Sequence, residues 1–331
     1  MRVTLRKFSP GLLPALLTAV VFLTASGSTN AQSTTRSFQM ALWTDLTHDA
    51  NSDIAVFWGG QPQPAGRSIW VNGPITTSLP DSQHMDWSRI VAVEFDEPYG
   101  PNNYPASLDS SLRLPDGTPA CQVSLTALNE AIAPQDAQLA LRAAELRARA
   151  PQARFWVNFT TTEAQWMATC IYDPLAFNRA YIDVVSTDWY DADFSTIQQF
   201  YSVIAANRPK PDQQLALIPG VYSAPNNQLQ YLQGYFSYAD SMNQSCNLPL
   251  GARGVTGYFD GCPVWVVLGW LSYSFAQGNT EYVGMLDPNS VLSGLIATNW
   301  EAELALPLRP GLAHQRSRAQ VIQPALQLLL Q

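Results

Sequence analysis

The sequence predicts an α/β chain folded as a (β/α)8 barrel of the TIM type. Eight short apolar segments occur along about 300 residues, helical segments lie between several of them, and repeats of fixed period are absent. Alternating strands and helices predict right-handed βαβ units. Continuous apolar runs are typical of parallel strands that are buried on both faces. A barrel of this type usually needs about 250 residues, which the chain provides.

The clearest expected strands are five apolar or aromatic runs. They are Ile90–Phe95, Arg154–Phe159, Ile182–Thr187, Leu215–Ile218 and Val264–Gly269. Three weaker runs complete the eight: Ile54–Trp58, Ser68–Val71 and Tyr282–Leu286. The segment between Trp58 and Ile90 has little helical pattern, so we expect the first third of the barrel to be irregular.

The clearest expected helix is Pro134–Ala150. Proline suits a first helical turn, and Asp136 suits the positive end of the helix dipole. Leu139 and Leu146 fall on one apolar face of this segment. The other expected helices are Ser195–Ala206, Gln228–Met242 and Val291–Thr298. A doubly wound open sheet is the alternative fold, but its usual glycine-rich phosphate turn, G-x-G-x-x-G, does not occur in the sequence.

Residues 1–31 have the pattern of a secretory signal peptide. Three basic residues precede an apolar run from Gly11 to Ala25, and small residues end the segment. The run is short for a bilayer span of about 20 residues, and Pro14 interrupts it. We therefore expect export to the periplasm or the exterior of a bacterial cell, with no membrane attachment after removal. Residues 32–306 are expected to form one barrel domain, and residues 307–331 a C-terminal extension of low or uncertain order.

The charge of the chain excludes one class of partner. Charged residues make up 13% of the sequence, against about 25% in typical soluble domains. The formal charge is −8, and it becomes −11 when the three basic residues of the signal are removed. An acidic chain has no electrostatic footprint for a phosphate backbone, so we expect no nucleic-acid partner.

All four cysteines lie after the signal segment, where an oxidising compartment favours disulfides. Three pairings are possible. Cys246–Cys262 would close a short loop, which leaves Cys121–Cys170 as the second expected pair.

Three carboxylates end the run that begins at Ile90, in the order Glu94-Phe95-Asp96-Glu97-Pro98-Tyr99. Catalytic side chains of a barrel gather at the carboxyl ends of its strands. Glu94 and Asp96 share one face of an extended strand, and a buried Glu94 would need a partner or a raised pKa. The structural alternative is an ion pair with Arg89 or Arg154.

A second acidic and aromatic group ends the run that begins at Ile182. Asp188, Trp189, Tyr190 and Asp191 follow one another there. Aromatic faces stack on sugars, and carboxylates bind hydroxyls or perform acid–base catalysis. The alternative is that Asp188 or Asp191 caps the helix that begins near Ser195.

Other polar and aromatic side chains stand at neighbouring strand ends. Asn158 could orient a substrate hydroxyl or a catalytic carboxylate, although a turn asparagine is an equal alternative. Trp58, Tyr99 and Trp270 could provide stacking surfaces for a ligand, and burial in the core is the competing interpretation for each.

Motifs for other chemistries are missing from the sequence. It contains no G-x-S-x-G, no H-E-x-x-H and no Walker loop, and its three histidines have no metal-ligand spacing. We therefore expect no metal and no cofactor. Paired carboxylates are the remaining chemistry, and glycoside hydrolysis needs only an acid together with a nucleophile or base.

The exported β/α chain with V-E-F-D-E-P-Y and S-T-D-W-Y-D resembles secreted (β/α)8 glycoside hydrolases, over about Asp53 to Thr298. The resemblance implies cleavage of a glycosidic bond in a polysaccharide or glycoconjugate. Glu97 or Glu94 would be the general acid/base and Asp188 the opposite carboxylate. Asp96, Tyr99, Asn158, Trp189, Tyr190, Asp191, Trp58 and Trp270 would bind or position the sugar.

Two alternatives to this function remain. One is a non-catalytic, carbohydrate-binding barrel that has lost an acid. The other is a metal-assisted hydrolase with oxygen ligands from Asp96, Asp188 or Asp191.

Overall fold

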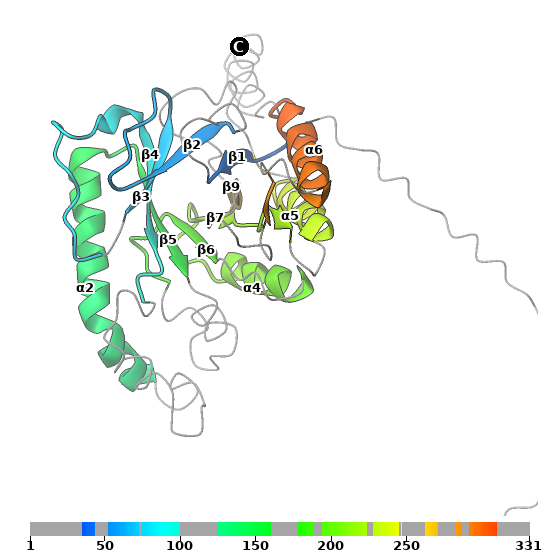
Figure 1. The fold of residues 1–331 in the computed structure, drawn as a ribbon. Coiled ribbons are helices and arrows are strands. Elements are labelled where there is room, and N and C mark those ends of the chain that lie inside the picture. Colours follow the sequence, from blue (N-terminus) through cyan, green and yellow to red (C-terminus); the bar gives the residue numbers. More distant parts are fainter. Residues whose placement is uncertain are drawn as a thin grey trace, which may run out of the picture. The chain divides into compact units, whose positions relative to one another are not determined.

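The chain is an eight-stranded parallel barrel, seen in a computed structural model (Figure 1). The structure describes residues 35–43, 52–72, 75–99, 125–159, 178–187, 194–223, 228–244, 246, 262–270, 283–285 and 291–309. The strands close in the order β1-β2-β3-β4-β5-β6-β7-β9, and every neighbouring pair is parallel. The predicted fold class is confirmed.

Seven of the eight barrel strands coincide with expected runs. The eight are β1 (Gln39–Leu42), β2 (Ile54–Trp58), β3 (Ser68–Asn72), β4 (Ile90–Asp96), β5 (Arg154–Phe159), β6 (Val184–Thr187), β7 (Gln214–Leu217) and β9 (Val264–Gly269). Boundaries differ from the expected ones by at most two residues, because strand ends depend on pairing as well as on side-chain type.

The eighth strand was predicted in the wrong place. Tyr282–Leu286 holds only the two-residue strand β10 (Val283–Gly284), which pairs antiparallel with β8 (Tyr222–Ser223) outside the barrel. The missing barrel strand is β1, which closes the barrel between β2 and β9. At four residues and with Gln39 at its start, β1 gives too short an apolar run to stand out.

Four α-helices accompany the strands in the described residues: α2 (Leu125–Arg149), α4 (Phe194–Ala206), α5 (Gln228–Met242) and α6 (Val291–Ala305). They lie around the outside of the strands (Figure 1). None of the helices described is long and apolar enough to cross a bilayer.

The predicted start of the first long helix was wrong, since α2 begins at Leu125 and contains Pro134 in its interior. An internal proline removes one helical hydrogen bond and bends the helix rather than always ending it. Figure 1 shows a bend in the N-terminal part of α2.

The first third of the barrel is irregular, as expected. Residues 59–67 connect β2 to β3 without a helix. In the described part of the connection from β3 to β4 the helical element is one short 3-10 turn, η2 (Trp87–Arg89). In the described residues, no α-helix follows β2 or β3, whereas α2 and α4 to α6 follow other strands.

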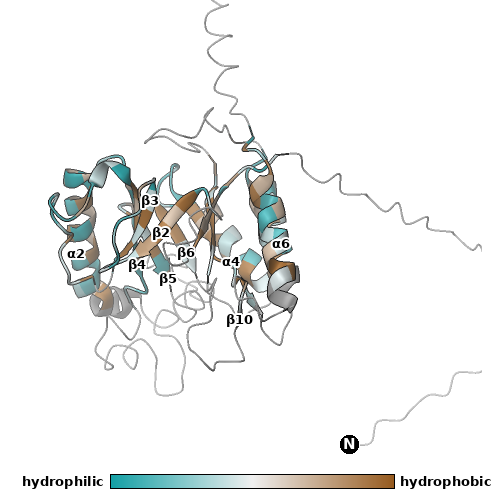
Figure 2. Cartoon of the chain, turned by 45° about the horizontal axis from the view of Figure 1, so that its top comes forward, coloured by the Kyte–Doolittle hydropathy of each residue, from teal (hydrophilic) through white to brown (hydrophobic). Residues whose placement is uncertain are grey.

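Two buried cores follow from the alternation of side chains along the strands. Ala41, Val56, Val71 and Trp156 belong to the smaller core, which fills the barrel interior. The larger core lies between the strands and the helices and contains Phe95 among many other residues. Figure 2 shows predominantly hydrophobic strands beside a largely hydrophilic α2. The inner positions near the carboxyl ends of β4 to β6 are polar, which makes this edge the place to look for a site.

Arg36 ties the start of the barrel to the end of the described chain. Its backbone N–H donates to Pro307 O at 3.0 Å, and its carbonyl accepts from the Arg309 N–H at 2.8 Å. Its guanidinium forms two hydrogen bonds with Asp53 and donates to Leu306 O at 2.9 Å. The residue is only 4% exposed. Residues 307–309 are thus joined to the barrel, while 310–331 lie outside the described residues.

Two acidic residues, Asp240 and Glu303, lie close to this junction. Asp240 on α5 accepts hydrogen bonds from the Ser37 N–H, at 2.9 Å, and from the Ser37 hydroxyl. Glu303 on α6 has its pKa raised to about 7, first by burial and then by the negative charge of Asp240, against a smaller opposing effect of Arg36. Glu303 is therefore a carboxyl group that keeps its proton in mild acid.

The disulfide Cys246–Cys262 is present, with the two Cα atoms 4.7 Å apart, and this predicted pairing is confirmed. Both cysteines are buried and belong to the barrel-interior core. The other predicted pair, Cys121–Cys170, lies outside the described residues.

Candidate active site at the carboxyl ends of the strands

Three polar side chains form a row across β4, β5 and β6. Asp96, Asn158 and Ser186 are in register on neighbouring parallel strands. The Asn158 Nδ2 donates to Asp96 Oδ1 at 2.9 Å, and the Ser186 hydroxyl donates to Asn158 Oδ1 at 2.7 Å. These bonds fix the orientation of the amide, so that Asn158 presents its nitrogen to the Asp96 carboxylate.

The row is anchored deeper in the barrel by Trp156. The indole N–H of Trp156 donates to the Ser186 hydroxyl at 2.7 Å. The Trp156 ring contacts Trp265 edge-on, with ring centroids 6.1 Å apart, and both rings are buried. Ser186 is thus an acceptor from Trp156 and a donor to Asn158, which leaves little rotational freedom in the row.

Asp96 and Glu97 form an adjacent pair of carboxyl groups with raised pKa values. Burial raises the pKa of Asp96, while its hydrogen bond from Asn158 acts in the opposite direction. Burial also raises the pKa of Glu97, and the negative charge of Asp96 raises it further. Both side chains remain partly exposed, so solvent and ligand can reach them. A partly buried carboxyl group with a raised pKa is suited to proton donation.

Glu97 has a backbone conformation that is rare for a residue with a side chain. Its φ is +43°, and among the described residues it is the only non-glycine with positive φ. Its N–H donates to Asn158 O at 2.9 Å, which holds the strand end against β5. Such a conformation costs about 1–3 kcal/mol and is common at active sites. It also breaks the simple alternation of faces, so the position of the Glu97 side chain could not be inferred from spacing.

Glu94 lies deeper than the other two carboxylates. It is 0% exposed and is paired in register with Trp156, two positions before Asp96. Asp96 and Glu97 are therefore the two members of the predicted cluster that a ligand at the barrel mouth can touch directly.

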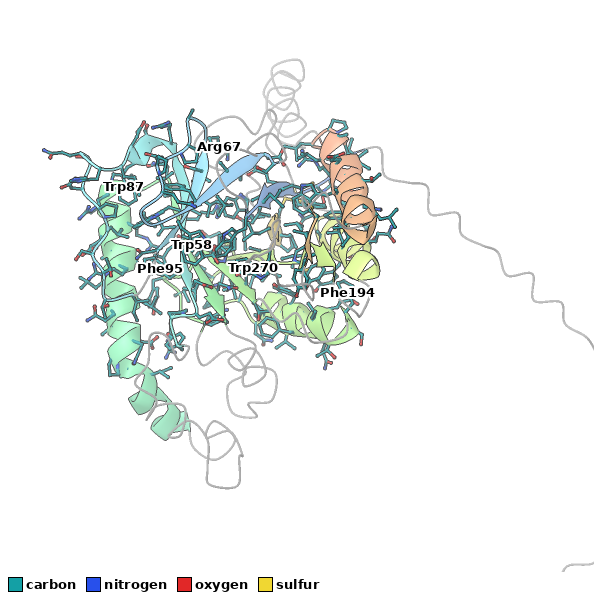
Figure 3. The ribbon with its side chains drawn as sticks, viewed as in Figure 1. Trp58, Arg67, Trp87, Phe95, Phe194 and Trp270 are labelled. Atoms are coloured by element: carbon teal, nitrogen blue, oxygen red, sulfur yellow. A yellow bond between two sulfur atoms is a disulfide. The ribbon has the colours of Figure 1, made fainter. Side chains whose placement is uncertain are left out.

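A tryptophan cluster lies at the ends of three consecutive strands, β9, β1 and β2. It consists of Trp43, Trp58 and Trp270. The ring centroid of Trp43 is 4.4 Å from that of Trp58 and 4.0 Å from that of Trp270. Figure 3 shows Trp58 and Trp270 near the middle of the ribbon. All three rings remain partly exposed, so the predicted residues Trp58 and Trp270 belong to one aromatic surface.

Tyr99 does not lie at the barrel mouth, the end of the barrel formed by the carboxyl ends of its strands. It is 4% exposed, its hydroxyl bonds to Asp136 of α2, and its ring stacks on Phe159 at 6.2 Å. These contacts place it in the core between barrel and helix. The predicted site residues Asp188, Trp189, Tyr190 and Asp191 lie outside the described residues.

Two members of the arrangement were missed from the sequence. Trp43 follows β1, the strand that escaped prediction, so no strand end pointed to it. Ser186 lies inside a predicted strand, two residues before Asp188, and its place on the same face as Asp188 was the available signal.

The donor atoms of the mouth suit organic acid–base chemistry. Among the described residues, no three His, Cys, Asp or Glu side chains are grouped so that they could hold a metal ion. The described mouth offers two adjacent carboxyl groups and three indole rings, and the buried Asn158 amide and Ser186 hydroxyl support the carboxyl group of Asp96. This arrangement can bind hydroxyl groups, exchange a proton and stack on an apolar ring face.

The fold and the mouth together define the class of the protein as a (β/α)8-type barrel with acidic and aromatic residues at the carboxyl ends of its strands. No protein-family model matches the sequence, and no curated protein matches it.

Among the solved structures that are similar, two have 9% sequence identity to this chain. One is a calcium-binding mutant of β-glucuronidase 2 from Bacteroides uniformis, with a TM-score of 0.43; the match covers 77% of this chain and 31% of that one. The other is a thermostable mutant of a xylanase from Cellvibrio japonicus, with a TM-score of 0.39; the match covers 80% of this chain and 97% of that one. The chain therefore spans less than a third of the glucuronidase.

Proposed function

We propose that this protein hydrolyses a glycosidic bond in a polysaccharide or glycoconjugate. The observation that supports this most directly is the pair Asp96 and Glu97, with raised pKa values, at the carboxyl end of β4. Glycoside hydrolysis needs one carboxylic acid that is protonated when the substrate binds and a second carboxylate that is ionised.

Glu97 is the proposed general acid/base. Its raised pKa favours the protonated form, which can donate its proton to the leaving-group oxygen. Asp96 tunes Glu97 through its charge, and Asn158 holds Asp96 by a hydrogen bond of 2.9 Å. The strained backbone of Glu97 supports a functional role, because strain persists where function requires a particular geometry.

Asp188 is the proposed opposite carboxylate. It stands two residues after Ser186, the spacing at which side chains of a strand share a face. Ser186 belongs to the row that ends at Asp96. If Asp188 acts as the nucleophile, the reaction retains the anomeric configuration; if Asp188 acts as a base for a water molecule, the reaction inverts it.

The tryptophan cluster is the proposed sugar-binding surface. The apolar face of a pyranose ring stacks on indole, while its hydroxyl groups remain free for the carboxylates of Asp96 and Glu97. Trp189, Tyr190 and Asp191 are proposed to extend this surface from the end of β6, because they follow Asp188 directly in the sequence.

Export is part of the proposal. The basic and apolar pattern of residues 1–31 is that of a signal peptide, and the Cys246–Cys262 disulfide is of the kind that persists in oxidising compartments. The mature protein would then act in the periplasm or outside the cell.

The test is a glycan panel applied to the chain from Gln32 onward, with and without a chelator. We expect reducing ends to appear from at least one polysaccharide, at the same rate in both conditions. Loss of activity with chelator would favour the metal-assisted alternative. Binding without cleavage would favour the non-catalytic barrel, for which the tryptophan cluster is the supporting observation.

Replacement of Asp96 by Asn should shift the pH profile of hydrolysis. The Asp96 charge raises the pKa of Glu97, so its removal lowers that pKa, although burial continues to raise it. A general acid must be protonated, and the alkaline limb of kcat/KM should therefore move to lower pH.

The matched control is Asp212→Asn, in an exposed turn before β7. Its profile should superimpose on that of the wild type. An alkaline limb that stays in place or moves upward in Asp96→Asn would show that Glu97 is not the acid that controls it.

A further inference from the structure

A pocket lies on the flank of the barrel beside β2 and β3, the strands that no described α-helix follows. Its volume is about 630 Å³. It is lined by residues of β2, of β3 and of the two connections that follow these strands. The lining residues are Phe57, Trp58, Gly59, Gly60, Gln61, Pro62, Gln63, Trp70, Thr77, Ser78, Pro80, His84 and Met85.

The lining of this flank pocket combines aromatic rings with amide and hydroxyl groups and one imidazole. Trp58 is the partly exposed aromatic member, whereas Phe57 and Trp70 are buried, and amide, hydroxyl and imidazole groups complete the lining. No Asp, Glu, Lys or Arg is among the lining residues named above. A partly exposed indole beside amide and hydroxyl groups matches a neutral sugar, which has apolar ring faces and many hydroxyls, better than an ionic ligand.

The wall of the flank pocket is held by hydrogen bonds of the protein itself. The Gln63 amide donates to Asp86 O at 2.9 Å and accepts from the Asp86 N–H at 2.8 Å. Gln61 Oε1 accepts from the Trp58 N–H at 2.9 Å, and the Gly59 N–H donates to Val71 O at 3.3 Å. The loop after β2 is therefore shaped without help from a ligand.

Trp58 connects the flank pocket to the barrel mouth. It lines the pocket, and its ring lies 4.4 Å from that of Trp43 in the tryptophan cluster. A linear ligand that stacks on the cluster can continue past the end of β2 into the pocket without leaving a protein surface.

From these contacts we infer that the flank pocket binds the part of a neutral polysaccharide chain that extends beyond the mouth, so that the enzyme prefers long, uncharged chains to short oligosaccharides. This inference rests on the proposed function. It specifies the substrate class as a neutral polymer that occupies the mouth and the flank together.

The test compares chain lengths in a protein whose flank pocket is partly filled. A Cβ atom at Gly59 would meet no atom within 4 Å, and Ser78 is exposed, so Gly59→Leu with Ser78→Leu adds apolar volume without a clash at the first side-chain atom. Gly60 is left unchanged because its φ is +89°. Thr76→Leu, at an exposed residue outside the lining, is the matched control.

The probes are xylo-, cello- and manno-oligosaccharides of two to eight sugars, with binding followed by calorimetry. For one of the three series the wild type should bind the longest member at least tenfold more tightly than the shortest. The double variant should reduce this ratio about tenfold, and Thr76→Leu should leave it unchanged. An unaltered ratio in the double variant would overturn the inference.

Failure of the proposed function gives a different result. If the wild type bound neither short nor long members of any series, both proposals would fall. If the wild type bound short oligosaccharides, and its affinity did not increase with oligosaccharide length, the inference alone would be wrong. A change of oligomeric state in the double variant would assign the flank pocket to self-association and would also overturn it.

Discussion

Replacement of Glu97 by Gln should reduce kcat for glycan hydrolysis by about 10²–10⁴-fold, the usual contribution of a general acid or base. Glutamine keeps the size of the side chain and removes its proton-donating group. Because the substitution does not alter the tryptophan cluster, binding of the substrate should persist. Asp188→Asn should cause a loss of similar size if it is the opposite carboxylate.

The controls for this result are a Glu→Gln change elsewhere and a measurement of stability. Glu301→Gln, at an exposed position of α6, should retain full activity. Glu97→Gly should unfold at a higher temperature than Glu97→Ala, because glycine accepts the positive φ that costs other residues about 1–2 kcal/mol. If Glu97→Gln and Asp188→Asn both keep wild-type hydrolysis, the catalytic assignment is wrong.

Replacement of Arg36 by Met should lower the free energy of unfolding by about 3–5 kcal/mol, the range for breaking a buried ion pair by removing one partner. The change leaves Asp53 with the Met40 N–H, at 2.7 Å, as its neighbouring donor. It also removes the side-chain bonds to the carbonyls of Leu306 and Phe38. In a domain of this size the melting temperature should fall by about 10 °C, which thermal unfolding will measure.

The matched control is Arg147→Met on α2. Arg147 is 45% exposed and lies 3.3 Å from Asp183, so its ion pair should be worth about 0–1 kcal/mol. The double variant Arg36→Met with Asp53→Leu should recover part of the loss, since no unpaired buried charge remains. Equal losses in Arg36→Met and Arg147→Met would show that this junction is not important for stability.

The barrel could be predicted from the sequence because several of its strands have clear strand-like sequence patterns. β4, β5 and β9 are continuous runs that are buried on both faces, and such runs have few competing interpretations. β1 could not be recognised, because its four residues form too short an apolar run, although they are buried and paired with β2 and β9. Pro134 was placed at a helix start, although packing of α2 against the barrel tolerates it in the interior.

Site residues could be predicted only where the alternation of side chains along a strand determines which way each side chain points. Asp96 and Asn158 lie at strand ends on inward-facing positions, and the structure joins them by a hydrogen bond. Tyr99 comes after the turn at Glu97, where strand alternation no longer applies, and it lies against α2 instead. Trp43 follows β1, which was not predicted, so the sequence did not indicate that Trp43 lies beside Trp58 and Trp270. The tryptophan cluster was therefore found only in the structure.

The carboxyl group of Glu303 couples folding to proton uptake. Its pKa is about 7 in the folded chain, above its ordinary value of 4.5. Between these two values the folded chain holds a proton that the unfolded chain releases, so this group's contribution to stability is complete below pH 4.5 and is lost as the pH rises through about 7. Through this group, mild acidification therefore increases the stability of the folded chain instead of lowering it.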